Sequence, residues 1–304
     1  MHLCYSFYVR AHTSPTELTD AERWNLIQRK AQAVRVLRAF ELFRTKGIEP
    51  ILIKGIAAGR FYPELQIRVS LDIDLAVSSE DFDRARSLAE SSAAEGLAID
   101  LHRELRNHDS VEWSDLVKHS QNYEIEGGSI RVLRPEDHLR VLCVHWLTDG
   151  GTSKDRLWDI YYAIENRASD FDWDRCLNIV DAKRRRWLTC TIGLAHRYLG
   201  LDLTGTPIQE EAANLPSWLT RTIETEWASD TPDQPLETTL DDRQMLLRQI
   251  KKRLSPNPIS ATVLMNGSFD ARTRLVYQIG NIFMRMGPSY RRISRAFSIK
   301  MSER

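Results

Sequence analysis

The sequence predicts an α+β protein in which a mixed-sheet α/β domain is followed by an all-helical region. In residues 17–134, short apolar or alternating segments typical of strands are interleaved with segments of helical periodicity. From residue 135 onward, apolar residues recur almost only at helical spacing. A chain of 304 residues is long enough for about two domains. We therefore expect an N-terminal arm at 1–16, an α/β domain at 17–134 and a helical domain at 135–304.

The α/β domain is expected to open with a long amphipathic helix. Thr19 and Glu22 have the spacing of a capping box, and the apolar residues after them recur in steps of three and four. Gly47 is well placed to end this helix. The elements expected next are a strand at 48–53, a short helix at 56–62, a strand at 71–77, a helix at 80–94, a strand at 97–105 and a hairpin made of 122–126 and 129–133.

Two of these expectations rest on the alternation of apolar and polar residues. Ile99 and Leu101 alternate with polar neighbours, which predicts a strand with one wet face. Gly127-Gly128 separates two further alternating segments, as in a β-hairpin. The domain therefore reads helix, strand, helix, strand, helix and then three strands.

The helical region is marked by long segments of helical period, separated in part by proline-rich loops at 206–216 and 231–235. The basic end of the chain is expected to be a frayed or partner-binding helix. The helices expected in this region cover 135–147, 156–167, 173–200 and 240–254, with the basic segment at 290–304.

Composition narrows the functional classes. Lysine plus arginine and aspartate plus glutamate both number 42, and this zero net charge argues against binding nucleic acid by charge alone. The four cysteines show no zinc-ligand spacing, and buried free thiols in a reducing compartment are expected. No secretory leader and no transmembrane segment are indicated. We expect a cytoplasmic protein.

The segment RVSLDIDLAV places two acids in an otherwise apolar strand. Residues i and i+2 of a strand point to the same face, so Asp72 and Asp74 are expected side by side, opposite Leu71, Ile73 and Leu75. Their mutual repulsion would be relieved by a cation such as Mg²⁺, which prefers oxygen ligands. Asp100 is expected on a neighbouring strand, so three carboxylates would suit two metal ions. The alternative is a solvated acidic face on an edge strand.

Upstream, ILIKGIAAG ends a strand at a glycine and begins a helix. Gly55 allows the backbone to approach a ligand, and Lys54 could add a positive charge to the same phosphates. A plain turn between strand and helix is the alternative reading.

Taken together, LIKGIAAGRFYPELQIRVSLDIDLAV, AIDLHREL and LRPEDHLRVLCVHWLTDGGTSKDRLWDIYYAI resemble the uncharacterised nucleotidyltransferase family of the polymerase β-like superfamily. The resemblance covers about residues 48–165. It implies a polymerase β-like nucleotidyltransferase domain at the N-terminus. The chain departs from the superfamily pattern in two places: Lys-Gly-Ile replaces the usual Gly-Ser or Gly-Gly, and TDGGTSKD stands where the family has a second histidine.

The resemblance also implies roles for individual residues. The expected metal-binding and catalytic acids are Asp72, Asp74 and Asp100; the nucleotide-facing residues are Lys54, Gly55, Arg68, Ser70 and His102; and the helical region contributes His145 and Asp159, whose roles the resemblance leaves open. From the residues alone, His102 is more readily a hydrogen-bond partner or a surface residue than a base, although it could touch Asp100 or a bound phosphate. His145 is at least as readily a core histidine as a site residue.

The function implied is transfer of a nucleoside monophosphate from a nucleoside triphosphate, ATP in the first place, with release of pyrophosphate. Two Mg²⁺ ions, with Mn²⁺ as an alternative, would assist. The acceptor would be a small molecule, a peptide or a protein. The competing hypotheses are a nucleotide- or peptide-binding module without turnover and an RNA-modifying transferase, against which the neutral charge argues.

Overall fold

The computed structural model describes residues 18–229, 244 and 256–284. The expected N-terminal arm, nearly all of the helix expected at 240–254 and the basic segment at 290–304 lie outside these residues. Contacts between Cα atoms divide the chain into two compact units. Unit 1 comprises 1–101 and 122–132, and unit 2 comprises 102–121 and 133–304.

Unit 1 contains most of a five-stranded mixed sheet with the order β3-β2-β1-β5-β4. β1 pairs antiparallel with β2, Leu52 facing Leu75, and parallel with β5, Leu52 facing Val132. The sheet is therefore mixed, as expected, and β1 is its central strand. The strands are β1 (Ile51–Leu52), β2 (Ile73–Val77), β3 (Ile99–Arg103), β4 (Gln121–Ile125) and β5 (Gly128–Val132).

The long first helix, α1 (Asp20–Arg44), begins at the predicted capping box. The Glu22 backbone N–H donates to Thr19 Oγ1 at 3.3 Å, and the Thr19 N–H donates to Glu22 Oε2 at 2.8 Å. Gly47 follows the helix with φ of 71°, a left-handed conformation that suits a glycine at a helix end. The other helical elements of unit 1 are α2 (Ile56–Gly59), α3 (Phe82–Ala89) and the 3₁₀ turn η2 (Ser92–Ala94).

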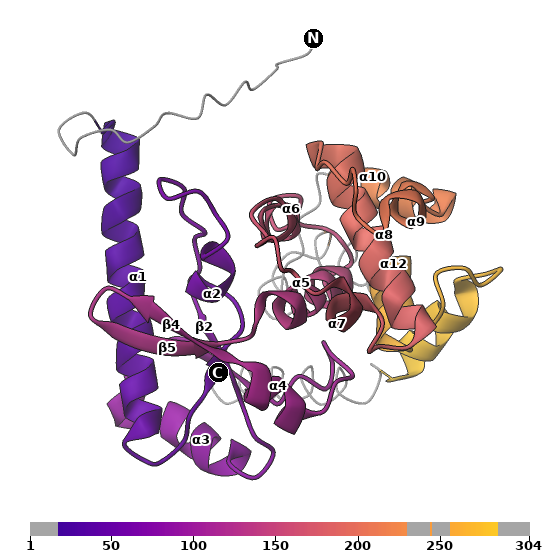
Figure 1. Cartoon of the computed structure of the whole chain (residues 1–304). Coiled ribbons are helices and arrows are strands. Elements are labelled where there is room, and N and C mark those ends of the chain that lie inside the picture. Colours follow the sequence, from indigo (N-terminus) through magenta and orange to yellow (C-terminus); the bar gives the residue numbers. More distant parts are fainter. Residues whose placement is uncertain (1–17, 230–243, 245–255, 285–304) are drawn as a thin grey trace. The chain divides into compact units, whose positions relative to one another are not determined.

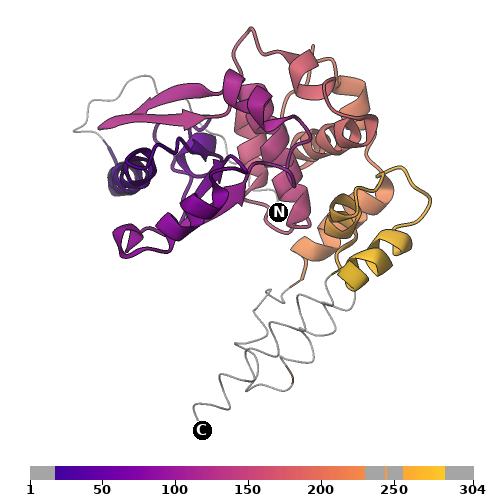
Figure 2. The same ribbon diagram turned by 90° about the horizontal axis from the view of Figure 1, so that it is seen from below.

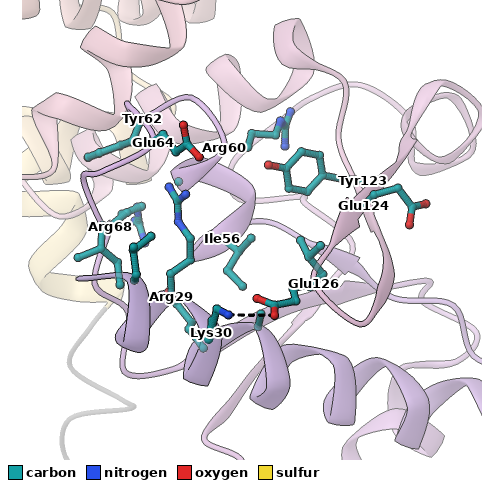
Figure 3. A pocket seen from close by; sticks show the side chains of 16 residues that line it. Arg29, Lys30, Ile56, Arg60, Tyr62, Glu64, Arg68, Tyr123, Glu124 and Glu126 are labelled. Atoms are coloured by element: carbon teal, nitrogen blue, oxygen red, sulfur yellow. Dashed lines mark ion pairs between the residues drawn. The ribbon is translucent and has the colours of Figure 1, made fainter. Parts of the chain in front are cut away.

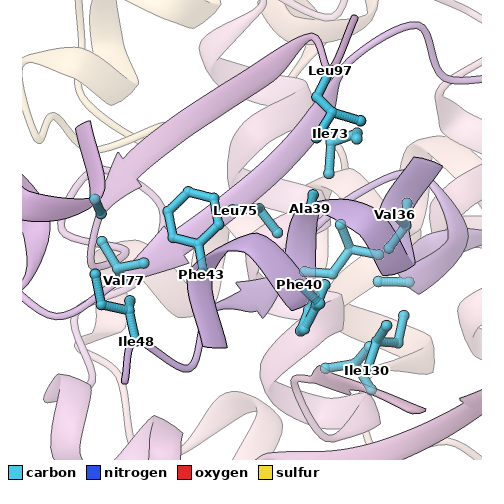
Figure 4. Close-up of a cluster of buried hydrophobic side chains, with 14 residues drawn as sticks. Val36, Ala39, Phe40, Phe43, Ile48, Ile73, Leu75, Val77, Leu97 and Ile130 are labelled. Carbon is cyan, nitrogen blue, oxygen red and sulfur yellow. The ribbon is translucent and has the colours of Figure 1, made fainter. Parts of the chain in front are cut away.

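The core of unit 1 forms where α1 and α3 cover one face of the sheet (Figure 4). Alternate residues of β2 point into this core because side chains alternate along a strand. Asp74, between them, must therefore point to the opposite face. The core residues are Val36, Ala39, Phe40 and Phe43 of α1, Ile73, Leu75 and Val77 of β2, Ala85 of α3, Ile130 and Val132 of β5, and Ile48, Leu52, Ala57 and Leu97.

The strand that carries the acidic pair begins later than predicted. Leu71, expected in the core, is 81% exposed, and β2 starts at Ile73. The backbone carbonyls of Leu71 and Asp72, the two residues before β2, accept hydrogen bonds from side chains. Arg35 donates to the Leu71 carbonyl at 2.5 Å, and Ser70 Oγ donates to the carbonyl of Asp72 at 3.0 Å. Because these carbonyls are bound by side chains, β2 begins only at Ile73.

Unit 2, among its described residues, is built mainly from helices packed on one another (Figures 1 and 2). Every regular element in 135–229 and 256–264 is a helix. The helix expected at 173–200 is two helices, because Asp181 accepts the Arg184 backbone N–H and starts a new one. The helices are α4 (Trp113–His119), which the sequence did not predict, α5 (Pro135–Thr148), α6 (Leu157–Glu165), α7 (Trp173–Leu177), α8 (Ala182–Leu199), α9 (Gln209–Ala213), α10 (Ser217–Trp227) and α12 (Pro258–Leu264).

A buried ion-pair network holds the segment after β3 to the helices of unit 2. Arg140 of α5, 1% exposed, donates to Asp109 Oδ2 at 2.9 Å and to Asp137 Oδ1 at 2.7 Å. Arg175 of α7 donates to Asp137 and to Asp115 of α4, both at 2.8 Å. Charges taken out of water require such partners. The network therefore explains why residues 102–121 group with unit 2.

The three cysteines among the described residues agree with the expectation of buried free thiols. Cys143, Cys176 and Cys190 are buried free thiols, and burial raises the pKa of the Cys176 thiol to about 12. Thiols of this kind stay protonated and unreactive. Among the described helices, none combines the length and the apolarity that a membrane crossing requires.

Candidate functional site

Strands β2 and β3 bring two acids and a histidine together on the face of the sheet opposite the unit 1 core. One ligand atom each from Asp74, Asp100 and His102 lies within 4.8 Å of the others. Asp100 and His102 share one face of β3 because they are two residues apart. Asp74 is 1% exposed, His102 is half-buried and Asp100 is exposed. One side of the cluster is thus closed by protein and the other is open to solvent.

Asp72 does not belong to this cluster. It lies one residue before β2 and is exposed, so the strand geometry that would align it with Asp74 is absent. The Ser70 hydroxyl donates to Asp72 Oδ1 at 3.2 Å and also to the Asp72 carbonyl. The structure therefore brings together two of the three predicted acids and adds His102, for which the sequence suggested a contact with Asp100 or a phosphate.

Lys54 contacts the cluster directly. Its Nζ donates to Asp74 Oδ1 at 2.5 Å, and the two side chains are 14% and 1% exposed. If one partner of such a buried ion pair is removed, the charge of the other is left uncompensated, which strongly destabilises the fold. The sequence had placed Lys54 at the nucleotide phosphates, whereas here its ammonium group neutralises the buried carboxylate.

The Gly55 turn links this ion pair to α2. Gly55 has φ of 60° and ψ of −124°, a conformation that side chains with a Cβ rarely adopt. A Cβ at Gly55 would lie 3.4 Å from Gln32 Nε2 and 3.6 Å from Ser70 Cβ. Ser70 thus lies beside the turn, as the sequence predicted.

Arg68 is 7% exposed and packs its Cβ 3.5 Å from the position that a Cβ on Gly59 would take. Arg68 also lines a cavity between α1, α2 and β4 (Figure 3). This cavity is lined entirely by residues of unit 1 and does not include Asp74, Asp100 or His102.

The donor set of the cluster suits a divalent cation. Two carboxylates and an imidazole are common ligands of Mn²⁺, Zn²⁺ and Fe²⁺, whereas Mg²⁺ prefers oxygen ligands alone. If Mg²⁺ binds, Asp74 and Asp100 are its natural protein ligands, and His102 can hydrogen-bond a bound water or phosphate. The spacing of the ligand atoms is compatible with a single shared ion.

A row of histidine rings leads away from the cluster within unit 2. The rings of His102 and His108 meet edge to face at 5.8 Å, and those of His108 and His145 stack at 5.3 Å. His145 Nδ1 lies 3.3 Å from Asp149 Oδ2. The predicted helical-region histidine is thus half-buried in this row, and the predicted Asp159 is 3% exposed in α6. His108 was missed because it lies in a loop without periodicity.

Comparison with known proteins adds one finding. A family model described as uncharacterised nucleotidyltransferase matches residues 11–200 of the chain. This range contains the acid–histidine cluster, the Lys54–Gly55 turn and the histidine row. No curated protein and no protein of solved structure matches the chain.

Proposed function

Because the chain belongs to the family of uncharacterised nucleotidyltransferases, we propose that it moves a nucleoside monophosphate from a nucleoside triphosphate to an acceptor. The acceptor oxygen bonds to the α-phosphorus, the bond from that phosphorus to the pyrophosphate oxygen breaks, and the acceptor proton passes to the protein. The polymerase β-like topology, the two-metal mechanism, the choice of ATP and a small-molecule, peptide or protein acceptor are parts of this proposal.

The observation that carries the proposal is the convergence of Asp74 and Asp100 with His102 at metal-binding spacing. A divalent cation held there would offset negative charge on the reacting phosphate. Asp74 is the inner, buried ligand. Asp100 is exposed, so it can both bind the cation and receive the acceptor proton.

The remaining residues are assigned to the triphosphate. Lys54, which donates to Asp74 in this structure, would donate to a phosphate oxygen when the triphosphate binds. The Gly55 turn would let the backbone approach the same phosphate. Ser70 lies beside that turn, and Arg68 adds a buried guanidinium nearby in sequence. Asp72, exposed and next to β2, is assigned to a second ion.

A second candidate function is nucleotide binding without turnover. Two observations favour it: Asp72 stands outside the cluster, and the chain has Lys-Gly-Ile at the turn where the superfamily has Gly-Ser or Gly-Gly. A module of this kind would bind ATP or GTP with a divalent cation and release no pyrophosphate.

The test is transfer of label from α-³²P-ATP to an extract separated into small molecules, peptides and proteins, with Mg²⁺ or Mn²⁺. We expect label in one fraction, with equal release of pyrophosphate. Asp74→Asn and Asp100→Asn should each lower transfer by at least about 100-fold, because several kcal/mol of charge stabilisation is lost. The control is Asp83→Asn, an exposed acid of α3 that pairs with Arg86.

Calorimetry with ATP and GTP decides between the candidates. Binding that depends on the metal, without any transfer of label, supports the module. Transfer that survives both Asp74→Asn and Asp100→Asn rules out the assigned catalytic acids.

A further inference from the structure

The cavity between α1, α2 and β4 has the features of a small-molecule site. Its volume is about 370 Å³, within the range of ligand pockets. Four segments of unit 1 line it, and the cavity therefore exists within a single unit.

The walls of the cavity are fixed by contacts between distant segments. Asn25 donates to the Leu65 carbonyl at 3.2 Å and Arg29 donates to the Gln66 carbonyl at 3.3 Å, which ties the 62–68 segment to α1. Lys30 pairs with Glu126 at 3.1 Å, which ties α1 to the hairpin (Figure 3). A cavity braced in this way exists before a ligand arrives, which lowers the entropic cost of binding.

The arginines of the cavity are more deeply buried than its glutamates. Arg68 is buried and Arg29 and Arg60 are half-buried, whereas Glu64 and Glu124 are exposed at the rim. Lys30 and Glu126 are also exposed and neutralise each other. A guanidinium shielded from water attracts an anion more strongly than a solvated rim carboxylate repels it. The interior of the cavity is therefore selective for an oxyanion.

The floor of the cavity adds an apolar requirement. Half-buried aliphatic side chains from α1, α2, the 62–68 segment and β4 would complete their burial against a ligand, and two tyrosines offer aromatic faces. Arg29 Nη2 and Arg60 Nη1 donate to the carbonyls of Gln66 and Ala57, which orients both guanidinium groups in the cavity wall. A guanidinium carries five N–H donors in a fork that matches a carboxylate or a phosphate. The half-buried apolar and aromatic lining residues are Leu26, Ile56, Ile67, Ile125, Tyr62 and Tyr123.

We propose that this cavity binds a small organic anion with an apolar or aromatic body and, resting on the proposed function, that the anion is the acceptor of the nucleoside monophosphate. Gln32 lines the cavity, and its Nε2 lies 3.4 Å from the position that a Cβ on Gly55 would take, so the cavity adjoins the turn assigned to the triphosphate. The carboxylate or phosphate of the acceptor is anchored by Arg29 and Arg60, while Arg68 stays assigned to the triphosphate. A hydroxyl at its other end is the nucleophile.

The binding test uses the full chain in EDTA without nucleotide, so that its result does not depend on the transfer reaction. Calorimetric titrations with 3-phenylpropionate and phenyl phosphate identify which oxyanion is preferred, and 3-phenylpropylamine is the cationic control. We expect one site for at least one anion and at least tenfold weaker binding of the amine. Arg29→Gln should weaken anion binding about tenfold or more, whereas Arg23→Gln, an exposed residue of α1 paired with Asp20, should leave it unchanged.

Hydrogen exchange of the wild-type chain supplies a measurement that needs no variant. Bound probe should slow exchange in 26–33 and 123–126 and leave 99–103 unaffected. Absence of binding by both anions, or protection elsewhere only, overturns the site. If Arg29→Gln loses probe binding but keeps full label transfer, the acceptor assignment is wrong; loss of transfer with retained ATP binding supports it.

Discussion

Lys54 and Asp74 form an ion pair that is almost completely shielded from water, in the cluster assigned to a divalent cation. The ammonium group and a metal ion would compete for the same carboxylate. The pair therefore explains how the chain tolerates a buried acid while no metal is bound. Under the proposed function, the metal would bind most readily together with a triphosphate whose phosphate oxygens replace Asp74 as the partner of Lys54.

This competition predicts that removal of Lys54 strengthens the binding of a metal ion at the cluster. Lys54→Met should bind Mn²⁺ alone about tenfold more tightly than the wild type, because a nearby positive charge is removed. The same variant should bind ATP more weakly, since it lacks the charge assigned to the phosphates. Calorimetry with Mn²⁺ and then ATP measures both effects.

Lys46→Met, a change at an exposed lysine after α1, is the matched control and should alter neither affinity. Without metal, Lys54→Met should also unfold at a lower temperature, because Asp74 loses its partner. Weaker binding of Mn²⁺ by Lys54→Met than by the wild type would contradict the competition.

At the scale of elements, α5 shows how a helix start can depend on pH. Glu136, in the first turn of α5, is 3% exposed. Its Oε2 accepts Arg134 Nε at 2.7 Å, and its Oε1 accepts the Asp172 backbone N–H at 2.8 Å. Burial favours the protonated acid, but the hydrogen bonds from Arg134 and from backbone N–H groups, together with the charge of Arg134, outweigh it and hold the pKa of Glu136 below its usual value.

A carboxyl whose pKa is lower in the folded state stabilises the protein above its unfolded-state pKa, and this contribution is lost as the pH falls through the folded-state pKa. We expect Glu136→Gln to lower the free energy of unfolding at pH 7 by about 1.5–3 kcal/mol, the usual worth of hydrogen bonds to a charged group. The deficit should shrink as the pH is lowered from 5 toward 3. Urea unfolding at several pH values measures it, with Glu95→Gln, an exposed acid, as the control. A deficit that stays constant with pH would contradict a charged Glu136.

The same scale shows what the sequence could and could not predict. The capping box at Thr19, the turn at Gly127-Gly128 and the succession of strands along the chain depend on neighbouring residues, and local patterns contain that information. The start of β2 does not, because Arg35, distant in sequence, binds the carbonyl of Leu71. α4 was missed for a similar reason: its Asp115 is held by Arg175, sixty residues away.

The candidate site, too, could be predicted from the sequence only in part. Asp100 and His102 could be paired from the strand period alone, and Asp74 follows from the apolar residues on either side of it. The exposed position of Asp72 and the ion pair between Lys54 and Asp74 could not be predicted, because both depend on how segments far apart in the chain pack.

At the scale of the whole molecule, the contacts between Cα atoms group the residues differently from the change in composition. Sequence reasoning placed the boundary at residue 134, which stays a prediction about domains. The contacts instead group 102–121 with the helices that follow 133. Strand β3, which carries Asp100 and His102, therefore continues directly into a segment that is anchored in unit 2 through Asp109 and Arg140.

A fragment that ends at residue 134 tests this organisation. It would keep the sheet residues and the acids of the cluster but would lose Arg140 and Arg175, the partners of Asp109 and Asp115. Leu105 and Leu116, 2% and 1% exposed in the full chain, would lose the helices of unit 2 among which they are grouped. We expect amides in 105–119 to exchange at least about 100-fold faster in fragment 18–134 than in the full chain, because local opening would no longer break buried ion pairs. Amides of α1 serve as the internal control and should stay protected if unit 1 keeps its own core. Equal protection of 105–119 in both proteins would show that this segment is held by the sheet domain, and the boundary at 134 would then be the correct one.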